Sequence, residues 1–279
     1  MSEPDKIERL GNSYIQHGTF NDRIYLMKLS CKDYPDIVNR LDNLAGYHGY
    51  SKIFAKVPES AGSFFRKNDY KIEASIPSFY NDEETGLFLG KFLKKNRQNS
   101  SDRGIIWSVL KTAEEKVTLP DTPALPEEMQ WRICVPDDAE EMAEAYRRIF
   151  ETYPFPIRDP TYLRETMADN MVYFAVECEG KIVSLASSDM YKEDGHAEMT
   201  DFATLPEYRR NGLATFLLSV MEEEMRRQGL KLSYTIARSL SYGMNITFSR
   251  MGYRYSGTLL NNTNISGRLE SMNVWYKFL

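Results

Sequence analysis

Cysteine and histidine are scarce in this chain. Its 279 residues include three cysteines and three histidines. Cys31, Cys134 and Cys178 lie far apart without a CxxC pair, so we expect reduced structural thiols rather than a disulfide framework, a metal site or a thiol nucleophile. His17 and His48 show no metal-ligand spacing, and we therefore assign no metal.

Long apolar runs and a dominant positive charge are also absent. The opening MSEPDKIERL lacks the apolar core of a signal peptide, and no stretch approaches the roughly 20 apolar residues of a membrane span. The formal net charge is -5 and the basic residues are scattered, which argues against a nucleic-acid-coating surface. We expect a cytoplasmic protein that binds a small molecule, with no nucleic-acid or membrane partner.

Hydrophobic residues are plentiful, and one break in composition divides the chain. They make up 42% of it, which at this length allows a sizeable core and favours two domains. From Lys94 the sequence runs through the polar KKNRQNSSDRG, the apolar IIWSVL and a segment with three prolines, a composition typical of a linker. We predict a first domain over 1–95, a linker over 96–128 with a short docked helix, and a second domain over 129–279.

The second half alternates between strand and helix patterns, which predicts a mixed α/β fold with an α+β sheet. Three strands with turns at Glu179-Gly180 and Asp194-Gly195 form a meander, and two more strands form the tail. The expected elements before the tail are a strand at 131–135, helices at 136–150 and 161–168, strands at 172–180, 181–191 and 196–205, a helix at 211–228, a strand at 230–237 and a helix at 242–251.

A basic turn opens the longest of these helices, in TLPEYRRNGLATFLLSVMEEEM at 204–225. A helix N-terminus has unpaired backbone N–H groups and the positive end of the macrodipole, so it favours a phosphate group. Gly212 lets the backbone approach the ligand and Ala214 keeps the approach open, while Arg209 and Arg210 add positive charge. The spacing is neither GxGxxG nor GxxxxGK[ST], so the pattern predicts an anion cradle of another kind.

The order of elements around this R-x-x-G-x-A turn, ending in FSRMGY, resembles the GCN5-related N-acetyltransferase (GNAT) superfamily from about Trp131 to Leu279. The resemblance implies a splayed mixed sheet and acetyl-CoA as co-substrate. It implies that Arg209 to Ala214 hold the pyrophosphate and that the strand before them faces the pantetheine arm. The cofactor-binding residues expected on this basis are Phe202, Ala203, Thr204, Arg209, Arg210, Asn211, Gly212, Leu213, Ala214 and Thr215.

The first half repeats part of this order. Its patterns predict strand, helix, strand, helix and two strands, as over 200–279, and Phe65 and Tyr70 in FFRKNDY match Phe248 and Tyr253 in FSRMGY. We expect a partial, degenerate GNAT-like domain. The counterpart of its pyrophosphate turn, KLSCKDYPDIV, has no glycine, so we expect a support, a lid or a dimer surface rather than a second CoA site.

Acyl transfer to a lysine-like amine needs a general base, because that amine titrates near 10.4 and arrives charged. Strand alternation in HAEMTDFATL puts Glu198 on one face and Asp201 on the other. Glu198 also sits where some family members place a glutamate base, and Asp201 is the second choice, as base or as anchor for an ammonium. Backbone N–H groups near Phe202 to Thr204 are expected to stabilise the developing oxyanion.

The sequence leaves two alternatives for the proton donor to the leaving thiolate. The position at which the family usually has tyrosine is Phe248, which carries no proton. Either Tyr242, earlier on the same helix, replaces it, or the thiolate leaves without a protein acid. His196 is next to Gly195 in a turn, and we expect it at the surface.

Substrate choice is expected in the loop FETYPFPIRDP, which in this superfamily borders the acceptor site. Tyr153 and Phe155, stiffened by prolines, are predicted to wall a methylene chain, with Glu151 for an ammonium and Arg158 for a carboxylate. A rigid packing loop is the alternative reading of the same residues.

The segments GNSYIQHGTFNDRIYLMKL, GYSKIFAKVP and YPFPI resemble the β-lysine N6-acetyltransferase family. This resemblance implies transfer of acetyl from acetyl-CoA to β-lysine by direct attack of the amine on the thioester, giving N6-acetyl-β-lysine, a compatible solute of osmoadaptation. Two alternatives stay open, an acetyltransferase of another small amine such as a polyamine or amino acid, and a non-catalytic acyl-CoA sensor. A homodimer also stays open.

Overall fold

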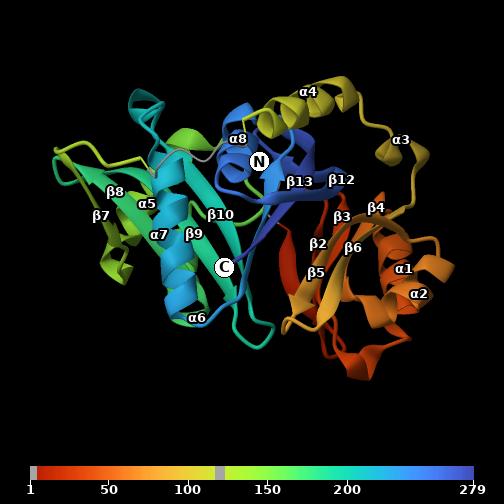
Figure 1. Cartoon of the computed structure of the whole chain (residues 1–279). Helices are drawn as coiled ribbons and strands as arrows, with labels where there is room; N and C mark the ends of the chain where they lie inside the picture. The colour runs from red at the N-terminus through yellow and green to blue at the C-terminus, as the bar shows by residue number, and fades with distance from the viewer. Residues whose placement is uncertain (1–4, 117–122) are drawn as a thin grey trace.

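Two mixed sheets lie side by side in the computed structural model, which describes residues 5–116 and 123–279 (Figure 1). Residues 117–122 of the predicted linker 96–128 lie outside the described residues. The expected mixed α/β class is confirmed, with a second sheet in the N-terminal half. The domain boundaries at 95 and 129 stay a prediction.

The N-terminal half forms a six-stranded sheet in the order β1-β2-β3-β4-β6-β5, with β3 and β4 parallel. Its helices α1 and α2 cover one face, where they pack on an apolar core that includes Ile24, Leu41 and Phe65. The elements are β1 (Lys6–Leu10), β2 (Ser13–Gly18), β3 (Arg23–Lys28), α1 (Ile37–His48), β4 (Lys52–Pro58), α2 (Glu59–Lys67), β5 (Lys71–Tyr80), β6 (Glu84–Phe92) and α3 (Lys95–Gln98).

The C-terminal half forms a seven-stranded sheet in the order β12-β13-β11-β10-β9-β8-β7, with β10 and β11 parallel. The elements are α4 (Arg103–Glu114), β7 (Met129–Ile133), α5 (Ala139–Ile149), α6 (Pro160–Asp169), β8 (Met171–Cys178), β9 (Lys181–Tyr191), β10 (His196–Thr204), α7 (Leu213–Arg227), β11 (Leu232–Arg238), α8 (Tyr242–Arg250), β12 (Arg254–Ile265) and β13 (Arg268–Phe278).

The two sheets share one connectivity. β3, α1, β4, α2, β5 and β6 repeat the order and neighbours of β10, α7, β11, α8, β12 and β13. The predicted match of aromatic pairs holds as well, because the rings of Phe65 and Tyr70 and those of Phe248 and Tyr253 both lie 5.0 Å apart, edge to face. β1 and β2, which the sequence patterns did not reveal, take the places of β8 and β9. The N-terminal half is therefore a partial copy of the C-terminal fold.

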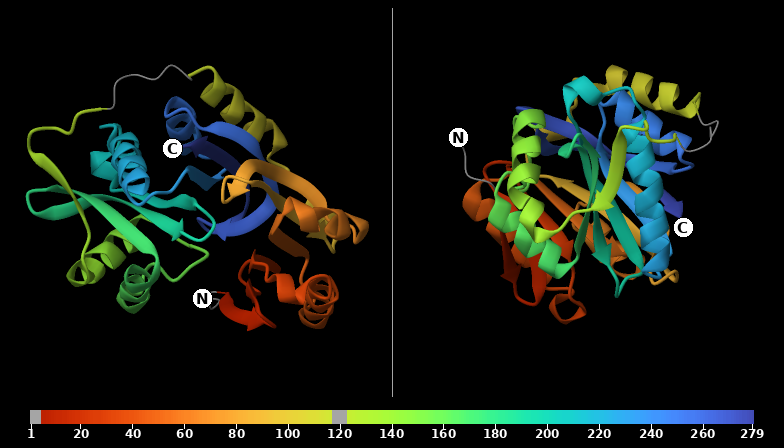
Figure 2. Two further views of the ribbon diagram at one scale, coloured as in Figure 1. Left: turned by 60° about the horizontal axis from the view of Figure 1, so that its bottom comes forward. Right: turned by 90° about the vertical axis from the view of Figure 1, so that its left-hand side faces the viewer.

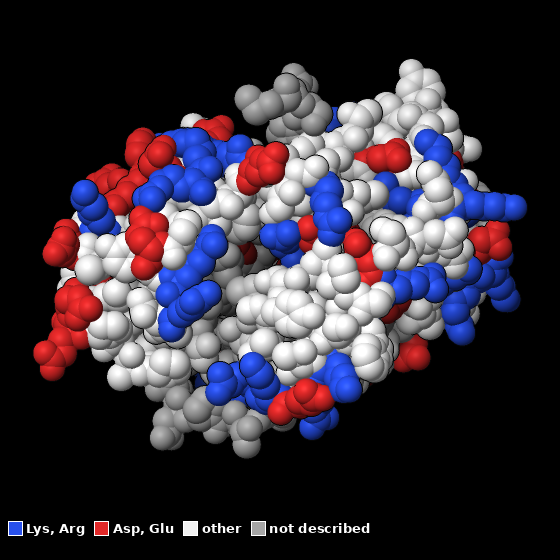
Figure 3. Space-filling model, turned by 90° about the horizontal axis from the view of Figure 1, so that it is seen from above, with Lys and Arg blue, Asp and Glu red and all other residues white. Residues whose placement is uncertain are grey.

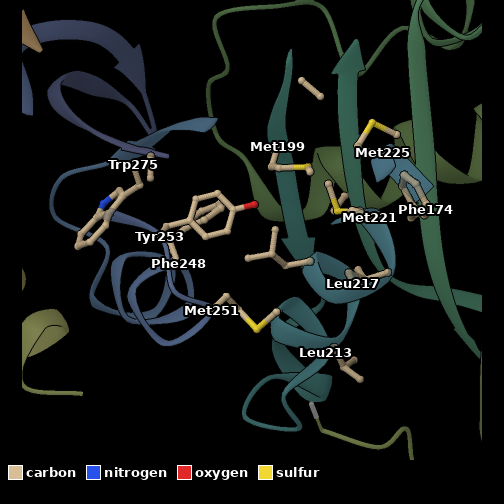
Figure 4. Close-up of a cluster of buried hydrophobic side chains, with 14 of the residues drawn as sticks. Phe174, Met199, Leu213, Leu217, Met221, Met225, Phe248, Met251, Tyr253 and Trp275 are labelled. Atoms are coloured by element: carbon tan, nitrogen blue, oxygen red, sulfur yellow. The ribbon is translucent and has the colours of Figure 1, made fainter. Parts of the chain in front are cut away.

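Helices cover opposite faces of the C-terminal sheet, α7 and α8 on one and α5 and α6 on the other (Figure 2). Leu213, Leu217, Met221 and Met225 recur every four residues along α7 and point into one buried cluster (Figure 4). Each such buried side chain stabilises the fold by about 1.5–3 kcal/mol. This packing fixes the start of α7 at the end of β10.

A third apolar cluster joins the two halves. Phe54, Phe79 and Phe88 of the N-terminal sheet pack with Tyr234 and Val274 of the C-terminal sheet, all buried. The edge strands β5 and β12 also touch, where Ser256 Oγ donates to Ser75 O and accepts from Ser75 N. The halves are thus held as one body, which lets both contribute to a site between them.

The predicted docked helix in the linker is α4. It packs on α8, where Ser249 Oγ donates to Ala113 O at 2.8 Å. Among residues 5–116 and 123–279, none belongs to a helix long and apolar enough to cross a membrane.

Candidate active site

A β-bulge interrupts β10 where the candidate catalytic residues lie. Its pairing with β9 shifts register between Thr200 and Ala203, and Asp201 has a left-handed φ of 55°. Simple alternation predicts Asp201 on the face opposite Glu198. The bulge turns its side chain instead, so that both carboxylates line the same cavity. The expectation of opposite faces is therefore wrong.

The sheet opens beside this bulge. β10 and β11 pair for three residues only, the last pair being Glu198 with Tyr234, whereas β10 stays paired with β9 as far as Thr204. Along the opened edge, the backbone groups of β10 have no ladder partner in β11. Thr204 O accepts from Arg209 Nε at 3.1 Å, and the other groups of this edge are available to an extended ligand. This edge includes the residues expected to face the cofactor arm, Phe202, Ala203 and Thr204.

A turn with two left-handed residues joins β10 to α7. Arg210 and Gly212 both have φ of 72°, and no side chain of the described residues caps the N-terminus of α7. The N–H groups of its first turn therefore remain for a ligand. The structure gathers all the predicted cradle residues around this helix start. Arg209, Arg210 and Asn211 are exposed, and the others are partly or fully buried: Gly212, Leu213, Ala214 and Thr215.

A cavity of about 470 Å³ lies between the opened sheet, the loop after α5 and the N-terminal half. From above, the molecule is hollowed near its centre, with Lys or Arg side chains beside the hollow (Figure 3). Tyr153 and Phe155, two of the predicted substrate residues, line the cavity, as do Phe202 and Phe248. Its wall is mostly aromatic and aliphatic, with a few charged groups, as expected of a site for a small ligand.

Glu198 is the charged residue best placed to act as a base. Burial raises the pKa of its carboxyl to about 7, although the nearby Lys56 charge lowers that pKa. Tyr234 Oη donates to Glu198 Oε2 at 2.9 Å, and Lys56 Nζ donates to Tyr234 Oη at 3.1 Å. A carboxyl with a pKa near neutrality takes up and releases a proton easily, which suits a general base.

Asp201 has a different environment from Glu198. Tyr153 Oη donates to its Oδ1 at 2.5 Å, and Ser187 Oγ donates to its Oδ2 at 2.6 Å. Burial raises the pKa of Asp201, and these two hydrogen bonds lower it. Since both oxygens already accept from protein hydroxyls, Asp201 is better suited to hold Tyr153 and the bulge in place than to remove a proton.

The charged members of the predicted substrate loop do not reach the cavity. Arg158 donates to the backbone carbonyls of Phe150 and Glu151, and neither Arg158 nor Glu151 lines the cavity. The Glu151 carboxylate lies instead beside Gly267 in the turn between β12 and β13. The structure therefore separates this loop into an aromatic part that faces the cavity and a charged part that supports the loop.

Tyr242, the predicted alternative proton donor, is the first residue of α8 and is 44% exposed, outside the cavity lining. Phe248 lines the cavity and is fully buried, with its ring 5.6 Å from that of Phe202. The structure thus shows an apolar wall at the place where the family usually has tyrosine, and it gives Tyr242 no contact with the site.

His196 is not at the surface, so that expectation is wrong. Its ring is fully buried, 3.9 Å from the ring of Phe79, and burial lowers its pKa to about 2. The N-terminal half covers this position, which a single strand pattern could not reveal. Within the described parts of the chain, no group of three or more His, Cys, Asp or Glu side chains is placed to hold a metal ion.

Sequence reasoning missed the contribution of the N-terminal half to the cavity. Arg23, Tyr25 and Phe54, from β3 and β4, line it together with the C-terminal residues, and Lys56 reaches Glu198 through Tyr234. The available signal was a charged residue within an otherwise apolar strand, as in RIYLMKL and SKIFAKV, because such a residue needs a partner when both faces of the strand are covered.

Comparisons with known proteins agree with this geometry. Residues 139–252 match the model of the acetyltransferase (GNAT) family. The chain is 42% identical over 273 residues to a β-lysine N(6)-acetyltransferase from Methanococcus maripaludis, covering 98% of each chain. It is 41% identical over 155 residues to the protein of that name from Methanosarcina mazei, covering 56% of this chain and 57% of the other. It is 31% identical over 271 residues to N-acetyltransferase YodP from Bacillus subtilis, covering 95% of each.

The chain belongs to the acetyltransferase (GNAT) family and is an N-acetyltransferase. The resemblance noted in the sequence is thereby confirmed. The match to the Methanococcus protein runs over both halves, so the N-terminal sheet is part of what the two proteins have in common.

Proposed function

We propose that the protein transfers an acetyl group from acetyl-CoA to the N6 amine of β-lysine. The observation that carries this proposal is the 42% identity to a β-lysine N(6)-acetyltransferase over 98% of both chains, together with a cavity to which both halves contribute. The members of this family use acetyl-CoA, which supplies the acetyl group as a reactive thioester.

The start of α7 fits the pyrophosphate of acetyl-CoA. Gly212 has a left-handed φ of 72°, the first-turn N–H groups lack a capping side chain, and Arg209 and Arg210 are exposed beside them. The open edge of β10 from Phe202 to Thr204 fits the amide-containing pantetheine arm, because it offers backbone donors and acceptors. These residues would hold the co-substrate with its reactive end toward the cavity.

Glu198 is proposed to receive the proton that the amine must lose. An amine with a pKa near 10.4 is almost fully charged at neutral pH, so its attack needs a nearby acceptor for that proton. With a pKa of about 7, the Glu198 carboxyl can take up a proton and release it near neutral pH. The backbone N–H groups beside the bulge would stabilise the oxygen that gains negative charge.

We propose that the rings of Tyr153 and Phe155 pack against the methylene chain of the acceptor, since both line the cavity beside Glu198 and Asp201. Tyr153 is held by its 2.5 Å hydrogen bond to Asp201, so its ring has a fixed orientation. Asp201 is thus proposed as a positioning residue. Glu151, Arg158 and Tyr242 have no part in this proposal.

Three finer points rest on the sequence alone. We propose that the protein works in the cytoplasm, that its product is a compatible solute, and that a homodimer is its assembly state. Light scattering of the purified protein tests the assembly state, and measurement of N6-acetyl-β-lysine in cells grown at low and high salt tests the role of the product.

The test of substrate class is the release of CoA from acetyl-CoA with β-lysine, α-lysine, ornithine and putrescine. We expect the highest kcat/KM for β-lysine, because a cavity that fixes a carboxylate and a near amine leaves the far amine at the thioester. A higher kcat/KM for putrescine would reject β-lysine but keep acetyl transfer. No CoA release with any amine would favour the sensor alternative.

Lys56 should set the pH at which the enzyme becomes active. Its charge lowers the pKa of Glu198, so Lys56→Met is expected to raise that pKa and to shift the acid limb of the kcat/KM profile upward by about one pH unit. Activity should fall at pH 6.5 and recover near pH 9. Lys67→Met, on the exposed side of α2, serves as the control. An unshifted limb with uniformly lower activity would show that Lys56 acts only in packing.

A further inference from the structure

Arg23 is a buried cation with an incomplete set of partners. It is 4% exposed, and burial lowers the pKa of its guanidinium to about 10. Its Nη1 donates to Asn262 O at 2.5 Å and to Thr263 Oγ1 at 3.2 Å. Among residues 5–116 and 123–279, its Nε is buried without a hydrogen-bond partner and no carboxylate lies within ion-pair distance of it. The Nε and Nη2 edge of the guanidinium, the edge that grips a carboxylate with two parallel bonds, is therefore unused.

The other buried cations around Arg23 are satisfied. Lys52 Nζ lies 2.7 Å from the Glu73 carboxylate, and Arg97 donates to Asn21 O, Asn261 O and Ser51 Oγ. A buried charge without a partner costs several kcal/mol, and Lys52 and Arg97 both avoid that cost. The free edge of Arg23 thus points to a partner that is not part of the chain.

Arg23 also differs from the other cations that line the cavity. These are Lys28, which is paired with Glu193 at 3.0 Å, and Arg238, which is paired with Glu270 at 2.7 Å. Among the described lining residues, Arg23 is the cation without a carboxylate partner. An acceptor with a carboxylate would therefore find one guanidinium in the cavity ready to bind it.

The position of Arg23 suits an acceptor with charges at both ends. Its guanidinium lies 5.4 Å from the Tyr25 ring centre and 5.8 Å from that of Phe54, which also line the cavity. Glu198 lines the same cavity as Arg23 and Tyr25, and the pKa of the Tyr25 hydroxyl is raised by the Glu198 charge and lowered by the Arg23 charge. A carboxylate at Arg23 would leave the opposite end of a short chain near Glu198.

We propose that Arg23, from the N-terminal half, binds the carboxylate of the amine acceptor through its Nε and Nη2 atoms and so makes the enzyme selective for an amino acid over a diamine. This inference rests on the proposed function. It gives the degenerate N-terminal domain a role, because the cation that the described part of the catalytic half adds to the cavity, Arg238, is paired with Glu270. Asn262 and Thr263 of β12 accept hydrogen bonds from Nη1 and so fix the orientation of the planar guanidinium group.

The test compares two acceptors, β-lysine and 1,4-diaminopentane, which is β-lysine without its carboxylate. In the wild-type enzyme, kcat/KM should be higher for β-lysine. Arg23→Met should lower kcat/KM for β-lysine by roughly 10- to 100-fold, mainly through KM, and leave that for the diamine unchanged. Activity on the diamine serves as an internal check that the variant folds.

Two more variants sharpen the result. Arg23→Lys keeps the positive charge but cannot donate two parallel hydrogen bonds to a carboxylate. This variant should therefore retain part of the preference for β-lysine. Arg66→Gln, exposed on α2, should keep the wild-type ratio. If Arg23→Met lowers kcat/KM for both acceptors by the same factor, or changes neither value, the inference is wrong, while the proposed acetylation of β-lysine stands. A wild-type enzyme that prefers the diamine would overturn both the inference and the proposed function.

Discussion

Glu198→Gln is expected to lower kcat with β-lysine by about 10²-fold or more at pH 7, with acetyl-CoA binding retained. Glutamine keeps the shape of the side chain and can still accept from Tyr234 Oη, but it cannot take up the amine proton. The loss should shrink as the pH approaches 10, where much of the amine is already uncharged. In the wild-type enzyme, activity should rise with pH through about 7, as the Glu198 carboxyl ionises.

The measurement is the pH dependence of kcat and kcat/KM for the wild type and the variant, with Glu223→Gln on the exposed face of α7 as a matched control. A Glu198→Gln enzyme with wild-type turnover at pH 7 would contradict the assignment. The role would then pass to Asp201 or to solvent, and Asp201→Asn would separate these two.

Gly212→Glu is expected to abolish acetyl-CoA binding at concentrations that saturate the wild type. The new side chain would place a carboxylate at the helix start where the pyrophosphate is proposed to bind, and its charge would repel that group. The position also has little room, because a Cβ would lie 3.0 Å from Pro123 Cβ, and its φ of 72° suits glycine. We expect only a small loss of fold stability, since Gly212 is at the edge of the core.

Gly229→Glu is the matched control for this variant. Gly229 follows the other end of α7, has a φ of 81° and has open space around it. It therefore receives the same charge and similar backbone strain far from the proposed pyrophosphate site. Calorimetry should detect acetyl-CoA binding in Gly229→Glu and none in Gly212→Glu. Equal affinity in both would contradict the placement of the pyrophosphate.

The sequence alone predicted what depends on local patterns. The meander of β8, β9 and β10, the basic turn and the helix after it are encoded by alternation, by turn residues and by the four-residue spacing of Leu213, Leu217 and Met221. The repeated order of elements in the first half was visible for the same reason, because each element has its own periodicity. The family resemblance added the proposed role of the Gly212 turn in binding pyrophosphate, which a six-residue motif does not indicate by itself.

The parts that could not be predicted depend on contacts between distant segments. Lys56 donates to Tyr234 across 178 residues, and Arg23 donates to the Asn262 carbonyl across 239 residues. Nothing in either local pattern indicates its partner. The orientation of the Asp201 side chain toward the cavity likewise depends on hydrogen bonds from Tyr153 and Ser187, which belong to other segments of the chain. Strand alternation applies to a regular strand, and the bulge breaks that condition.

The central claim is that acetyl goes to the far amine of β-lysine, and one competition experiment tests it most directly. The enzyme is given limiting acetyl-CoA with equal concentrations of β-lysine, α-lysine and putrescine, and tandem mass spectrometry identifies each product and the nitrogen that carries the acetyl group. The account predicts that N6-acetyl-β-lysine is the main product. Acetylputrescine as the main product, or acetylation of β-lysine at its 3-amino group, would contradict it.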